Sequence, residues 1–113
     1  MRSMLLAIGI FLSACGASVG ASSALVGQTC TSSQDCNQTC HTGDSHYPGG
    51  MCTIRCASDA DCPGGTSCVS EKDNICAVTC VNNNDCTAFG RGFVCDTRDR
   101  AGATGKALVC RVP

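Results

Sequence analysis

The stretch CASDADC, residues 56–62, occurs in three versions along the chain and decides the fold. The other versions are CTSSQDC at 30–36 and CVNNNDC at 80–86. Each version has five residues between its cysteines, a Ser or Asn two places after the first cysteine, and Asp immediately before the second. Self-similarity at a fixed spacing is typical of a structural unit built several times. We therefore expect three tandem units.

Cysteine is the main structural residue of these units. Two C-x3-C links, CTIRC at 52–56 and CAVTC at 76–80, join them. Cysteine makes up about 14% of residues 30–113, above the roughly 8–10% that marks a disulfide scaffold. No C-x2-C pair of the kind common in zinc sites occurs. We expect six disulfides in units 30–52, 56–76 and 80–110, formed by Cys30, Cys36, Cys40, Cys52, Cys56, Cys62, Cys68, Cys76, Cys80, Cys86, Cys95 and Cys110.

Each unit should begin with a capped turn. The Ser or Asn is a good helix N-cap, and the Asp three places later completes a capping box; these pairs are Ser32 with Asp35, Ser58 with Asp61, and Asn82 with Asp85. No amphipathic run comes after them, so we expect one helical turn. Pairing of the first cysteine with the third and the second with the fourth would join this turn to the hairpin of the same unit. Four cysteines allow three arrangements, and the spacing leaves the other two open.

Short β-hairpins should come after the turns. TSCVS (66–70) and ICAVT (75–79) flank the loop around Asp73, and GFVCDT (92–97) and ALVCRV (107–112) flank RDRAGATGK. The first unit is less regular, with the loop HTGDSHYPGG before Cys52. Large apolar residues are few after Gln28, and there is no Trp. The expected fold class is small and disulfide-rich, with three units that each form a capped turn plus a short β-hairpin and little hydrophobic core.

Residues 1–14 have the pattern of a signal peptide. A basic start precedes the apolar run MLLAIGIFL (4–12), which is too short to span a membrane. The tetrad Leu12-Ser13-Ala14-Cys15 resembles the lipobox of bacterial lipoprotein precursors. That resemblance implies lipid attachment at Cys15, with residues 15–29 as anchor and flexible tether before the cysteine-rich domain (30–113). Because Gly16 is not Asp, it also implies the outer membrane. Cleavage after Val19-Gly20-Ala21, which would give a secreted chain starting at Ser22, stays open.

A second resemblance concerns residues 56–80. CASDADCPGGTSC followed by C-x3-C is similar to the second half of the whey-acidic-protein four-disulfide core, although Val69 stands where that family has an adjacent cysteine. The resemblance implies, as an alternative function, a secreted protease inhibitor. The inhibitory loop of that family has no counterpart in this chain, so no reactive-site residue is assigned.

A haem or metal carrier is a further alternative. Cys36-Asn37-Gln38-Thr39-Cys40-His41 is one residue longer than the C-x-x-C-H haem attachment motif, and Met51 is a conceivable second axial ligand. His41, Asp44 and His46 lie in one loop and could bind a metal, but two histidines and an acid define no geometry. We expect disulfides and a solvated loop instead, and we assign no cofactor and no metal ligand.

Charge divides the chain. Residues 16–86 hold 2 basic and 7 acidic side chains, whereas residues 87–113 hold 5 basic and 2 acidic ones: Arg91, Arg98, Arg100, Lys106, Arg111, Asp96 and Asp99. We expect ordinary solvation of these charges and complementarity between one unit and another, and a surface for an anionic partner is the alternative. The formal net charge of −1 and the near absence of aromatics argue against nucleic acid.

No catalytic constellation is recognisable, because the thiols should be oxidised and no nucleophile elbow or phosphate-binding loop occurs. The sequence predicts an exported, lipid-anchored, non-catalytic interaction module at a bacterial surface or in the periplasm. Its partners would be the membrane, through the N-terminal lipid, and an unknown protein or glycan.

Overall fold

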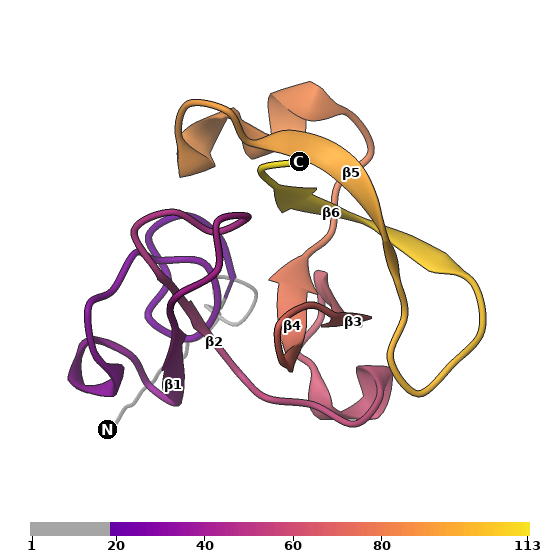
Figure 1. Cartoon of the computed structure of the whole chain (residues 1–113), viewed down its shortest axis with the longest axis horizontal. Coiled ribbons are helices and arrows are strands. Elements are labelled where there is room, and N and C mark those ends of the chain that lie inside the picture. Colours follow the sequence, from indigo (N-terminus) through magenta and orange to yellow (C-terminus); the bar gives the residue numbers. More distant parts are fainter. Residues whose placement is uncertain (1–18) are drawn as a thin grey trace, which may run out of the picture.

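The three cysteine groups form three β-hairpins, each preceded by a short 3-10 helix (Figure 1). This computed structural model describes residues 19–113. The first unit contains η2 (Ser33–Asp35), β1 (Thr39–His41) and β2 (Met51–Thr53). The second contains η3 (Asp59–Asp61), β3 (Thr66–Ser70) and β4 (Asn74–Val78), and the third η4 (Asn83–Phe89), β5 (Val94–Asp99) and β6 (Lys106–Arg111). The expected fold class is confirmed, with short antiparallel hairpins in all three units.

The Asp before the second cysteine organises each turn. Asp35 Oδ2 accepts hydrogen bonds from the backbone N–H groups of Thr31, at 2.9 Å, and Ser32, at 3.2 Å. Asp85 accepts from Val81 and Asn82 in the same way. These bonds satisfy donors that a helix start leaves without a partner. The prediction of a single turn is correct for η2 and η3, which are three residues long, and too short for η4, which extends over seven.

The hairpin register explains the disulfide pairing. The third and fourth cysteines of every unit lie directly opposite each other across the hairpin, as in Cys68↔Cys76. Each reaches back to one cysteine of the turn. The disulfides are therefore first to third and second to fourth, which is the expected pairing: Cys30–Cys40, Cys36–Cys52, Cys56–Cys68, Cys62–Cys76, Cys80–Cys95 and Cys86–Cys110.

The segment predicted as a flexible tether, residues 15–29, is folded over its described part, 19–29. Gly20 N–H donates to Val26 O at 2.9 Å, and Val26 is fully buried. Gln28 O accepts from Cys52 N–H at 2.8 Å, as Ile54 O accepts from the N–H of Cys76 in the second unit. The strand-like residue two places before the first cysteine is thus part of the repeat. Unit 1 begins before Cys30, and the tether is corrected to that extent.

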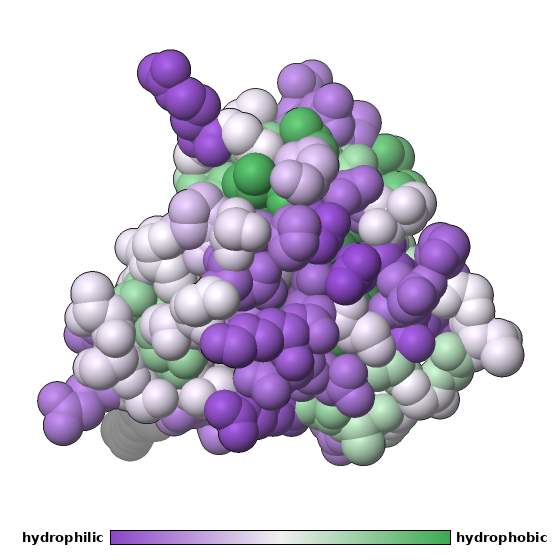
Figure 2. Space-filling view, in the orientation of Figure 1, coloured by the Kyte–Doolittle hydropathy of each residue, from purple (hydrophilic) through white to green (hydrophobic). Residues whose placement is uncertain are grey.

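The units close around a small shared core. Tyr47 and Met51 of the first unit pack with Val69, Ile75 and Ala77 of the second and with Val109 of the third. An isolated bridge joins Val69 to Arg100, and another joins Thr79 to Val109, so the third hairpin lies against the second. Figure 1 shows the C-terminus just past the end of β6, where Val112 N–H donates to His46 O of the first unit at 2.9 Å. In the same orientation the surface is largely hydrophilic, with apolar groups gathered over the third unit at the top (Figure 2).

Among residues 19–113, no helix has the length and apolar character needed to cross a membrane.

Candidate functional site

One buried ion-pair cluster connects all three units. Glu71, in the β3–β4 turn, has a side chain with no exposed surface. Its Oε2 accepts from Tyr47 Oη of the first unit at 2.8 Å and from Arg111 Nε of the third at 2.7 Å. Arg111 Nη2 reaches Glu71 Oε1 at 3.1 Å, and Arg111 Nη1 reaches Asp96 at 2.7 Å. We call these residues, with Arg98, the junction cluster.

The electrostatics of the cluster follow from burial and pairing. Burial opposes the charge of Arg111, but the hydrogen bonds to Glu71 and Asp96 outweigh it and raise the pKa of the guanidinium. Burial, followed by the charge of Glu71, raises the pKa of Tyr47, which keeps its hydroxyl protonated as a donor. A buried charge is tolerated only when it is paired and hydrogen-bonded. The cluster therefore holds the units in one arrangement.

Three of the five basic residues of the third unit, Arg98, Arg100 and Arg111, pair with acids of the second unit, as the charge asymmetry predicts. Arg98 Nε lies 2.9 Å from Glu71 Oε1, and Arg100 pairs with Asp59 of the second unit. Lys106 pairs with Asp99 inside its own hairpin. Arg91 forms no ion pair with any residue in the range 19–113. The sequence indicated this complementarity by composition, but it held no signal that Glu71 and Arg111 would be the buried pair.

A polar pocket of about 380 Å³ opens beside the cluster. We call it the junction pocket. Its lining comes from the HTGDSHYPGG loop of the first unit, the β3–β4 turn of the second and β5 of the third: Gly43, Asp44, Ser45, His46, Glu71, Lys72 and Arg98. Lys72 Nζ donates to Thr42 O at 3.3 Å, so its side chain crosses from the second unit to the first.

A smaller groove of about 230 Å³ lies between the first and third units. Met51, Phe89 and Phe93 supply its large apolar side chains. The two phenylalanine rings have centroids 5.7 Å apart. Ala21 and Gly27 also line it, which places the folded N-terminal segment at its edge.

The candidate metal residues of the sequence do not converge. His41 Nε2 lies 2.9 Å from Asp44 Oδ2, and its ring packs edge-on against Tyr47. His46 Nδ1 instead donates to Val112 O at 2.7 Å and so fastens the C-terminus to the first unit. Burial opposes the charge of Asp44, but the hydrogen bonds from His41 and His46 outweigh it and lower the pKa of this carboxyl. These side chains are partners in the fold of the loop.

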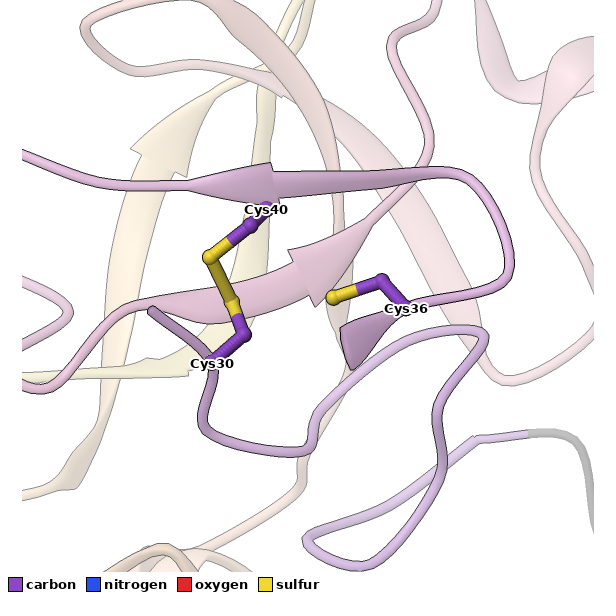
Figure 3. Close-up of side chains that lie close together, drawn as sticks. All are labelled: Cys30, Cys36 and Cys40. Carbon is purple, nitrogen blue, oxygen red and sulfur yellow. A yellow bond between two sulfur atoms is a disulfide. The ribbon is translucent and has the colours of Figure 1, made fainter. Parts of the chain in front are cut away.

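The cysteines of the haem-like motif are both in disulfides, Cys36 with Cys52 and Cys40 with Cys30. Figure 3 shows the Cys36 sulfur beside the Cys30–Cys40 bridge. Three sulfur atoms lie within 4.8 Å of one another in every unit. Metal ligation and thioether formation both require free thiolates, so the oxidised units do not offer these sulfurs to an ion or a haem.

Cys15 and the rest of the Leu12–Cys15 tetrad lie outside the described residues. The six disulfides indicate an oxidising, extracytoplasmic or secreted setting. No protein-family model, no curated protein and no solved structure matches this chain.

Proposed function

We propose that this protein is an exported, lipid-anchored module that binds a partner outside the cytoplasm and performs no catalysis. The apolar leader, the tetrad ending at Cys15 and the disulfide scaffold support export and anchoring. The junction cluster supports the binding role, because it gives a chain with little core a rigid surface assembled from three units.

The observation that carries the anchor is the folding of residues 19–21. Gly20 N–H donates to Val26 O, Val19 forms a bridge to Val26, and Ala21 lines the groove between the first and third units. Cleavage after Ala21 would remove all three residues and leave the buried Val26 without these neighbours. Cleavage before Cys15 keeps them and leaves Gly16, Ala17 and Ser18 between the lipid and the fold.

Expression of the chain with a radiolabelled fatty acid, beside a Cys15→Ser variant, tests the anchor. We expect label on the parent only, and parent protein in the membrane fraction that detergent releases. The variant should be unlabelled. A matched Ser13→Ala change keeps a small residue in the tetrad and should remain labelled. An unlabelled mature chain starting at Ser22 would refute the anchor.

A protease panel tests the absence of inhibition, and it is independent of the anchor. We expect no protease to be inhibited at micromolar protein, since the part similar to the four-disulfide core, residues 56–80, lacks the inhibitory half. Nanomolar inhibition of any member would replace the binding module with the inhibitor.

A further inference from the structure

The junction pocket contains more hydrogen-bond donors than its own acceptors can use. We propose that it binds the carboxylate of a small ligand, an acidic sugar or a peptide C-terminus. This rests on the proposed binding role but not on the lipid anchor.

The acids of the pocket are already occupied. Asp44 accepts from His41 through Oδ2 and from the backbone N–H of His46 through Oδ1. Glu71 has no exposed side-chain surface and accepts from Tyr47 and Arg111 through both oxygens. Glu71 also pairs with Arg98 Nε at 2.9 Å, so neither carboxylate is left to neutralise Lys72.

The cations of the pocket keep free donors. Arg98 Nε is buried in its ion pair with Glu71 Oε1, 2.9 Å away, and is not available to a ligand. The other guanidinium nitrogens of Arg98 donate to no residue within 19–113, and its side chain is 36% exposed. Lys72 makes one long hydrogen bond, to Thr42 O, and pairs with no acid in that range. The donors left for a ligand are therefore the remaining guanidinium nitrogens of Arg98 and the ammonium of Lys72, and their charge-assisted hydrogen bonds to a carboxylate are stronger than neutral ones.

The donor geometry selects the ligand class. A guanidinium offers a planar fork that matches the two oxygens of a carboxylate, and the ammonium of Lys72 adds a point charge. The pocket volume of about 380 Å³ accommodates one sugar ring or one terminal residue. Because the pocket is open and its charges are nearly balanced, we expect a dissociation constant on the order of 1 mM, the range that two charge-assisted hydrogen bonds support.

The test is a titration of the ¹⁵N-labelled chain from residue 15 onward with Cys15→Ser, which contains every described residue. Sodium glucuronate is the first probe, glucose the matched neutral sugar, and N-acetylglycylglycine the peptide terminus. We expect saturable amide shifts at Ser45, Lys72 and Arg98 with an acid, and none with glucose. Whichever acid binds more tightly identifies the source of the carboxylate.

Two variants locate the site. Lys72→Gln should weaken binding about fivefold to tenfold; it removes an exposed ammonium and its one hydrogen bond, to Thr42 O at 3.3 Å. Arg91→Gln, an exposed arginine of the third unit outside the pocket, is the control and should bind as the parent does. Arg98→Gln should abolish saturation, and its amide spectrum shows whether the fold persists.

Equal weakening by Arg91→Gln, shifts centred elsewhere, or no saturation by either acid would overturn the inference. An anchored chain that binds neither acid would refute this site alone and leave the anchor standing.

Discussion

Substitution of Glu71 by Gln keeps the shape of the side chain and removes its charge, which makes it the sharpest test of the junction cluster. In the parent, Glu71 accepts three hydrogen bonds, at 2.7, 2.8 and 3.1 Å, and lies 2.9 Å from Arg98. Gln can accept through only one oxygen, and its amide group faces the guanidinium of Arg111. Arg111, whose side chain is 5% exposed, then keeps only Asp96 as an anionic partner.

Loss of one partner of a buried ion pair costs about 3–5 kcal/mol. We expect the lower end, about 3 kcal/mol, because Asp96 stays 2.7 Å from Arg111 Nη1. Set against a typical unfolding free energy of about 5–15 kcal/mol, this is a large fraction. The disulfides remain intact, so the units should separate from one another while each keeps its own turn and hairpin.

Tyr47 reports the change directly. It is the only tyrosine in a chain without tryptophan, and it is 1% exposed and hydrogen-bonded to Glu71. Guanidinium unfolding of the oxidised protein, followed by tyrosine fluorescence and near-ultraviolet circular dichroism, measures the loss.

Asp73→Asn, two residues further along the same turn, is the matched control for Glu71→Gln. Its pairing with Arg55 is 4.0 Å long, with side chains 49% and 71% exposed, so the cost should stay below about 1 kcal/mol. If Glu71→Gln costs no more than Asp73→Asn and Tyr47 stays buried, the charge of Glu71 does not hold the units together.

Three other perturbations test the scaffold. Hydrogen bonds from backbone N–H groups, first those of Thr31 and Val81, lower the pKa values of Asp35 and Asp85, and the N–H of Cys68 followed by Arg100 lowers the pKa of Asp59. Because these carboxyls take up protons at higher pH in the unfolded chain than in the folded one, the stability they contribute should be complete above about pH 4 and fall below it. Urea unfolding midpoints that stay unchanged down to pH 2.5 would contradict this. Replacing both cysteines of the Cys86–Cys110 bridge by alanine should cost about 3.5 kcal/mol of stability, and doing so for Cys30–Cys40 about 2.7 kcal/mol, because the longer loop of 24 residues, against 10, loses more entropy when it is closed in the unfolded chain. Calorimetry of the two double variants compares their stabilities, and the reverse order would contradict this reasoning. Gly102 has φ +74°, and a Cβ added there would lie 2.2 Å from Ala57 O, whereas a Cβ added to Gly64 would have no atom within 4 Å. Gly102→Ala should lower stability by about 1–3 kcal/mol and Gly64→Ala by less than about 0.5 kcal/mol. Equal melting temperatures of the two variants would show that the third unit does not pack closely on the second.

The sequence by itself determined the repeat and the local structure of each unit. Cysteine spacing, the cap residues and the hairpin pattern are local features, and they predicted the turns, the second hairpin to within one residue and the disulfide pairing. The pairing is expected because it joins each turn to its own hairpin, and the structure selects it over the two other arrangements that the spacing leaves open, as in Cys56–Cys68 and Cys62–Cys76.

Residues 19–29 show where local reasoning fails. Small residues predict a flexible tether, but Gly27 has φ +127° and lies so close to the backbone that a Cβ would be 1.9 Å from Gly20 O. The glycines there permit a tight approach. The equivalence of Gln28 with Ile54, each two places before a first cysteine, was the available signal.

Only the tertiary structure decided the junction. Tyr47, Glu71 and Arg111 are separated by 24 and 40 residues, and each is a single polar residue in a loop or strand with no pattern around it. Composition indicates that the third unit carries most of the cations and that residues 16–86 carry most of the acids. Which of them become buried depends on how three hairpins pack around one small core, because desolvation selects the pairs whose geometry satisfies every donor and acceptor.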